Sequence, residues 1–151
     1  MIDIAKLEEV GRKTFTTPKV ARIAGLPIRK VLSYHERGYI RASIQEASGH
    51  GSKRLYSFAD VVKIKAIQVF QELGLSVDML RAISKRWDDG AGFSRNKRGS
   101  VIFSYMKSGV PFSSQSISDF IEEDLEGEPM VSLNVTAVDL ALRIKIMEEG
   151  P

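Results

Sequence analysis

The sequence predicts an α+β fold with a helical, basic first half and a mixed second half. Apolar residues recur at helical spacing up to residue 87, and short runs typical of strands lie around residue 50 and after residue 100. The chain has 151 residues, 43% of them hydrophobic and 27% charged. A chain of this length and composition can bury a core, which excludes a wholly disordered protein.

Charge is distributed unevenly along the chain. Ten Lys or Arg and only two Glu lie between Gly11 and Phe58, whereas nine acidic and two basic residues lie between Gln115 and Pro151. The overall net charge of +3 hides this asymmetry. A basic segment with interleaved Tyr and Gly is typical of proteins that bind the phosphate backbone of nucleic acids, and the alternative is a solvated basic face.

The sequence carries no constellation expected of an enzyme or a metal site. It has no Cys and two His, which excludes disulfides and thiolate sites. No phosphate loop, nucleotide fingerprint or nucleophile elbow is present, and the acidic run 122–124 is best explained as the solvated face of a helix. We predict that the protein is not an enzyme, uses no metal or cofactor, and has no membrane partner because its apolar runs are short.

A helix-turn-helix pattern follows a flexible or short helical arm at residues 1–14. The first helix is expected to be capped by Thr17, with Pro18 in its first turn, and to end at Gly25 in a left-handed conformation. The second helix begins near Ile28, which belongs to its predicted core-facing side. Two short helices joined through a glycine turn are typical of this motif, although other helical hairpins share the pattern.

A β-hairpin, or wing, is predicted after these helices. Its strands are residues 39–44 and 53–57, joined by a stretch rich in Gly and Ser. Lys53 and Arg54 place two positive charges on the second strand. Tyr56 is expected on the same face as Arg54, because side chains alternate along a strand.

Two further helices complete this half of the chain, one opening at residues 57–60 and one capped by Ser76 and continuing toward Trp87. Together with the helix-turn-helix and the wing they make a predicted domain of four helices and a hairpin at residues 15–87. Residues 88–100 are predicted to be a linker, since they hold three Gly and a basic run without periodicity.

Residues 101–151 are predicted to form a small α+β domain, in the order β-β-α-β-α, for dimerisation or sensing. The last segment has both helical and strand periodicity, and its length and Thr136 as a cap favour a helix. The predicted elements are strands at 101–106 and 109–112, a helix at 116–125, a strand at 131–135 and a helix at 136–149.

Residues 15–87 resemble the MerR family of bacterial transcription regulators, through the segments FTTPKVARIAGLPIRKVLSYHERGYIRAS and GSKRLYSFADVVKIKAIQVFQELGLSVDMLRAIS. The resemblance covers about half of the chain. It implies a winged helix-turn-helix protein that binds double-stranded DNA as a homodimer, with the second helix in the major groove and the wing on flanking phosphates. It also implies a bacterial, cytoplasmic and nucleoid-associated protein, with RNA polymerase as a further partner; an effector ligand is not identified.

The predicted DNA contacts lie on the first helix, the second helix and the wing. Cations of the second helix suit guanine edges, and those of the wing suit phosphates. The resemblance assigns phosphate contacts to Tyr34, Arg54 and Tyr56, with core packing as the alternative for the two tyrosines. Ser33 stands where the family usually has Arg, and His35 where an aromatic residue is usual. The full predicted set is Thr17, Lys19, Arg29, Lys30, Ser33, Tyr34, Arg37, Lys53, Arg54 and Tyr56.

Two other functions fit the same residues. One is an excisionase-like or nucleoid-type architectural factor, which would use the wing to bend DNA with weak sequence preference. The other is a protein-interaction module whose basic helix binds an acidic partner.

Overall fold

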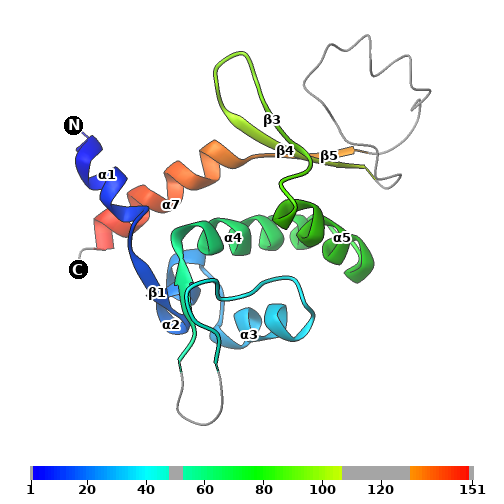
Figure 1. The fold of residues 1–151 in the computed structure, drawn as a ribbon, viewed down its shortest axis with the longest axis horizontal. Coiled ribbons are helices and arrows are strands. Elements are labelled where there is room, and N and C mark those ends of the chain that lie inside the picture. Colours follow the sequence, from blue (N-terminus) through cyan, green and yellow to red (C-terminus); the bar gives the residue numbers. More distant parts are fainter. Residues whose placement is uncertain (1, 48–52, 107–129, 150–151) are drawn as a thin grey trace.

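The computed structural model describes residues 2–47, 53–106 and 130–149. Helices and a small antiparallel sheet surround α4, which lies at the centre of the molecule (Figure 1). The elements in chain order are α1 (Ile4–Val10), β1 (Thr14–Thr16), α2 (Thr17–Ala24), α3 (Ile28–Glu36), β2 (Leu55–Ser57), α4 (Phe58–Glu72), α5 (Val77–Asp88), β3 (Phe93–Arg95), β4 (Val101–Met106), β5 (Met130–Asn134) and α7 (Val135–Glu149).

The helix-turn-helix consists of α2 and α3. Gly25 ends α2 with a φ of 72°, a left-handed conformation that glycine adopts without steric cost, and the Leu26 amide donates to the Ala21 carbonyl at 2.8 Å. The N-cap of α2 is Thr16, whose side chain makes no capping hydrogen bond. The predicted cap at Thr17 is therefore wrong by one residue, because Thr17 already has helical geometry.

A capping box fixes the start of α4. The Ser57 hydroxyl accepts from the Asp60 amide at 3.1 Å, and the Asp60 carboxylate accepts from the Ser57 amide at 2.9 Å. The same carboxylate accepts from the Ser43 amide and hydroxyl at 2.9 and 2.6 Å. Asp60 therefore ties the chain that precedes the wing to the helix that follows it.

The wing differs from the predicted hairpin. Strand β2 pairs antiparallel with β1, placing Phe15 opposite Tyr56. Residues 39–44 form no strand, and a single bridge joins Gln45 to Leu55. The physical reason is burial: Tyr39, Ile40 and Ala42 are all at most 3% exposed, so this segment packs into the core instead of alternating along a sheet.

The predicted linker also differs from the structure, since β3 lies within residues 88–100. It pairs antiparallel with β4, which pairs with β5, giving the strand order β3-β4-β5. The Asn96 side chain closes the β3–β4 turn by accepting from the Arg98 and Ser100 amides. The Gly-rich composition therefore marks a hairpin turn. The predicted strand at 109–112 and helix at 116–125 lie outside the described residues.

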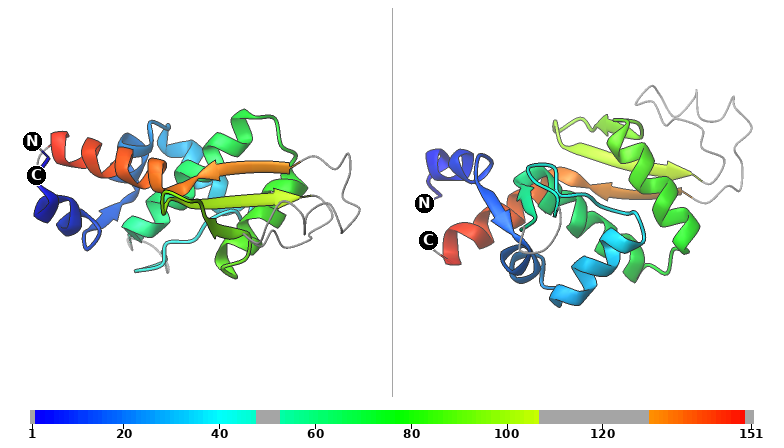
Figure 2. Two further views of the ribbon diagram at one scale, coloured as in Figure 1. Left: turned by 90° about the horizontal axis from the view of Figure 1, so that it is seen from above. Right: turned by 60° about the horizontal axis from the view of Figure 1, so that its bottom comes forward.

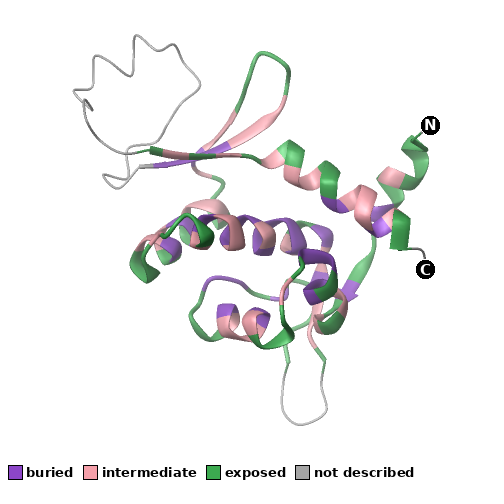
Figure 3. Ribbon diagram, turned by 180° about the vertical axis from the view of Figure 1, so that it is seen from behind, coloured by how far each residue is buried: buried purple, intermediate pink, exposed green. Residues whose placement is uncertain are grey.

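Helix α7 continues directly from β5 and packs on the N-terminal half of the molecule (Figure 2). It contacts α1, α2, α4 and β4, and its Leu142 and Ile146 are buried. Buried residues of both halves belong to one apolar cluster, and one side of α4 is buried within it (Figure 3). The predicted helix at 136–149 agrees with α7, while the division into separate domains stays a prediction.

None of the helices in the described part of the chain is long and apolar enough to cross a membrane.

Candidate nucleic-acid interface

Helix α3 presents one buried and one polar face. Val31 and Tyr34 are 0% and 1% exposed and hold the helix on the core, whereas Arg29 and Arg37 are exposed and Lys30 is half-buried. Ser33 is also half-buried. Hydrophobic periodicity produces this arrangement, because burying the apolar stripe turns the cations outward.

Tyr34 lies inside the protein. Its hydroxyl donates to the Gln71 side-chain oxygen of α4 at 2.8 Å, and its ring packs against Tyr39 with centroids 5.8 Å apart. Burial raises the pKa of Tyr34 to about 12. The structure thus places this tyrosine in the core, which was the alternative to a phosphate contact.

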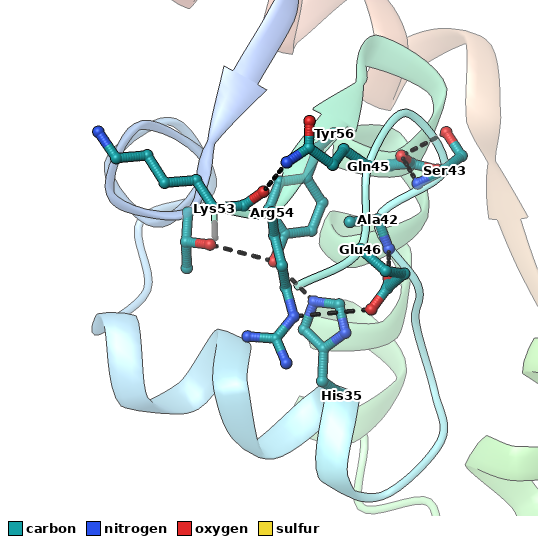
Figure 4. A network of polar contacts seen from close by, with 10 residues as sticks. His35, Ala42, Ser43, Gln45, Glu46, Lys53, Arg54 and Tyr56 are labelled. Carbon is teal, nitrogen blue, oxygen red and sulfur yellow. Dashed lines mark hydrogen bonds and ion pairs between the residues drawn. The ribbon is translucent and has the colours of Figure 1, made fainter. Parts of the chain in front are cut away.

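Tyr56 is also buried, and it joins three elements (Figure 4). Its hydroxyl lies 2.6 Å from His35 Nε2 on α3 and 3.3 Å from the Thr17 hydroxyl on α2. Tyr56 itself belongs to β2, so the first helix, the second helix and the wing strand meet at one hydroxyl. We call the three residues Thr17, His35 and Tyr56 the hydroxyl node.

Burial changes the ionisation of the node. It raises the pKa of Tyr56 and lowers the pKa of His35, and the nearby Arg54 lowers the His35 pKa further. His35 is therefore neutral at pH 7. A neutral imidazole offers one donor and one acceptor nitrogen, which allows a hydrogen bond with the Tyr56 hydroxyl in either direction.

The base of the wing is organised around Glu46. Its carboxylate accepts from the Ala42 amide and lies 3.7 Å from Arg54 Nε. Gln45 donates from its side chain to the Lys53 carbonyl at 3.0 Å, which joins the two sides of the wing. Lys53 itself is exposed, and its side chain extends away from the node (Figure 4).

A hollow of about 350 Å³ lies between the wing and the start of α2. The cations Lys53 and Arg54 border it on one side. The first turn of α2, which receives no side-chain cap and in which Pro18 has no N–H, lies on the other. Positive side chains facing a helix N-terminus suit an anion such as a phosphate. The lining residues are Thr16, Thr17, Pro18, Ala47, Lys53 and Arg54.

The structure therefore brings together only part of the predicted set. Helix α2 and the wing bring Thr17, Lys53 and Arg54 to one hollow, and Lys19 lies two residues further along α2, outside the residues that line it. The exposed side of α3 carries a second group, which is Arg29, Lys30, Ser33 and Arg37. Tyr34 and Tyr56 lie beneath these surfaces.

Sequence reasoning missed the roles of two residues. A lone histidine is usually structural, and no sequence signal identifies the Tyr56 hydroxyl as the partner of His35, because the two residues are 21 positions apart. Lys145 of α7 donates to the Arg22 and Ile23 carbonyls at the end of α2, at 3.2 and 2.9 Å. No local sequence signal connects positions that are more than 120 residues apart.

Comparison with known proteins places residues 15–87 in a described family. They match the family model of the MerR HTH family regulatory protein. The resemblance predicted from the sequence is thereby confirmed, and residues 15–87 form a MerR-type helix-turn-helix domain. The family is one of transcription regulators, not of enzymes.

Individual relatives agree with this assignment. Uncharacterized HTH-type transcriptional regulators of Mycobacterium bovis and Mycobacterium tuberculosis are 33% identical over 64 residues, which are 42% of this chain and 28% of theirs. The mercuric resistance operon regulatory protein of Shigella flexneri is 34% identical over 82 residues, which are 54% of each chain. The matched region thus spans about a quarter to a half of the length of these relatives.

Proposed function

We propose that the protein is a sequence-specific regulator of transcription that binds double-stranded DNA as a homodimer. The observation that carries the proposal is the outer face of α3, where cations stand opposite the buried stripe of Val31 and Tyr34. Arg29 and Lys30 have no ion-pair partner among the described residues. Their charges are therefore available to a ligand.

In this proposal α3 enters the major groove, where its N-terminal residues meet base edges. Arg29 is suited to the paired acceptors of guanine, and Lys30 and Arg37 to bases or phosphates nearby. Lys53, Arg54 and the N-terminal turn of α2 take a flanking phosphate in the hollow between the wing and α2. Thr17 lines this hollow and Lys19 follows two residues later on α2, while Ser33 of α3 is available to a phosphate oxygen.

The two buried tyrosines act indirectly in this proposal. Tyr34 fixes α3 on α4 through Gln71, and Tyr56 fixes α3 relative to β2 through the hydroxyl node. The family resemblance implies that the two tyrosines contact phosphates. We propose instead that they hold α3 in position for binding. This change rests on their exposed fractions of 1% and 0%.

A homodimer is expected to read two half-sites related by a two-fold axis, about one helical turn of DNA apart. The C-terminal part of the chain is the proposed site of dimerisation or sensing, since its sheet and α7 lie away from α3 (Figure 1). RNA polymerase is the expected further partner of a regulator of this kind.

The test is a salt-dependent binding titration on random duplexes, followed by sequencing of the bound fraction. We expect an enriched palindrome and a steep loss of affinity with salt, because phosphate contacts release counterions. Salt-dependent binding without an enriched sequence would favour an architectural factor. Absence of binding would overturn the proposal and favour an acidic protein partner.

A further inference from the structure

Ile28, the first residue of α3, is exposed to solvent. Its exposed fraction is 46%, although the sequence predicted it on the core-facing side of the helix. Val31 and Tyr34, further along the helix, are at most 1% exposed. The difference arises because α3 begins directly after the extended Pro27, so that its first turn precedes the residues that pack on the core.

Exposure alone does not indicate a function for Ile28, since single apolar residues are common on protein surfaces. The position of Ile28 in the fold does indicate one. Ile28 occupies the N-terminal end of the helix proposed to enter the major groove, and its neighbour Arg29 is an exposed cation. The N-terminal residues of a recognition helix are those that meet base edges.

The chemistry of the side chain selects one feature of the groove. Isoleucine has no hydrogen-bond donor or acceptor. A guanine oxygen or a cytosine amino group covered by it would lose water without gaining a partner. Thymine presents a methyl group in the major groove, and apolar side chains are suited to contact it.

We propose that Ile28 is a specificity residue that contacts the 5-methyl group of a thymine. The proposal rests on the proposed function and extends it to a particular base. Side chains of consecutive helical residues point about 100° apart, so Ile28 and Arg29 would meet different features of the groove.

The experiment uses the full chain and the duplex obtained from the selection described above. Each thymine is replaced in turn by deoxyuridine, which removes the methyl group and keeps every hydrogen-bonding group. We expect one position per half-site where the wild-type protein loses about three- to fivefold in affinity, the size expected for one buried methyl group. Ile28→Ala is expected to bind the unmodified site more weakly and to be indifferent to deoxyuridine at that position.

Two controls separate this contact from other effects. Leu73→Ala removes another exposed apolar side chain, 63% exposed at the end of α4, and should keep the wild-type response to deoxyuridine. Ile28→Ala should keep the wild-type salt slope, since no charge is removed. Thermal unfolding of both variants tests that they are folded.

The outcomes distinguish this inference from the proposed function. The role of Ile28 alone is overturned if binding is specific and salt-dependent but the wild type and Ile28→Ala respond equally to deoxyuridine. It is also overturned if neither protein responds to deoxyuridine. Absence of salt-dependent binding to any duplex overturns both. Loss of sensitivity at a single position in Ile28→Ala, with retention in Leu73→Ala, supports the inference.

Discussion

Helix α3 and the C-terminal helix α7 use positive charge in opposite ways. On α3, Arg29 and Lys30 have no ion-pair partner among the described residues. On α7, Arg143 pairs with Asp139 at 2.5 Å and donates to the Leu7 carbonyl, while Lys145 binds the last carbonyls of α2. A count of cations along the sequence does not separate these uses. The partners of the cations do separate them: Arg143 and Lys145 bind groups of the protein itself, whereas the charges of Arg29 and Lys30 stay open to a ligand in the proposed function.

The largest expected effect comes from breaking the contact between the C-terminal sheet and α4, the helix on which the N-terminal half packs. Phe103 of β4 is 0% exposed and packs edge-on against Phe70 of α4, with ring centroids 6.0 Å apart. Phe103→Ala should lower the free energy of unfolding by about 3–5 kcal/mol, as expected for a large buried aromatic residue. Urea unfolding followed by circular dichroism measures this loss.

The same experiment tests whether the two regions unfold together. A single transition shifted to lower urea is expected, because Phe103 and Phe70 belong to one apolar cluster. A second, separate transition that leaves the helical signal of residues 15–87 unchanged would instead support independent domains.

The next effect concerns an unpaired cation of α3. Arg29→Ala should weaken binding to the selected site by about 1–3 kcal/mol, the range for one bidentate contact to guanine, and should change stability by less than about 0.5 kcal/mol. Arg98→Ala is the matched control, since Arg98 is an exposed arginine on the β3–β4 turn. Fluorescence anisotropy with a labelled duplex measures both, and equal losses in the two variants would contradict the assignment.

A cation of α7 should show the reverse pattern. Lys145→Met should cost about 1 kcal/mol of stability, because carbonyls at the end of α2 lose a charged donor that is only partly screened by solvent. Chemical unfolding measures this loss, and the salt slope of DNA binding should stay at the wild-type value. A reduced slope would mean that Lys145 contacts DNA, which would erase the contrast between the two helices.

The smallest effect concerns the pH dependence of stability. The pKa of His35 is lowered in the folded protein by burial and by Arg54, with Glu46 and Asp60 acting in the opposite direction. The unfolded chain therefore binds more protons near pH 6, and stability should fall as pH decreases below the ordinary histidine pKa of about 6.5.

His35→Gln is the matched variant, because glutamine keeps a hydrogen-bonding group and does not titrate. Its free energy of unfolding should change less than that of the wild type between pH 7.5 and 5.5. Identical pH profiles for the two proteins would show that the hydroxyl node tolerates a protonated His35.

Local patterns made much of the N-terminal half predictable. The turn at Gly25 depends on residues only a few positions apart. The capping box of Ser57 and Asp60 is equally local, and the sequence indicates that a helix starts there. The β1–β2 pairing was not predictable in this way, since it joins strands 40 residues apart and competes with a nearer apolar segment that is used for the core.

The candidate site divides similarly. The cations on the outer face of α3 follow from its hydrophobic periodicity. The roles of Tyr34 and Tyr56 do not follow from this periodicity, because a tyrosine side chain is suited both to core packing and to a phosphate contact. Their burial and their partners, Gln71 in one case and His35 in the other, favour the core.

The contact between Lys145 and α2 also sets an order of events during synthesis. Ile23 leaves the ribosome 122 residues before the lysine that binds its carbonyl. At about 5–20 residues per second, this is a delay of roughly 6–24 s. Throughout that interval, α2 lacks the hydrogen bonds that Lys145 donates to its last carbonyls. The contact that Lys145 makes with the end of α2 therefore forms only after α7 has been made.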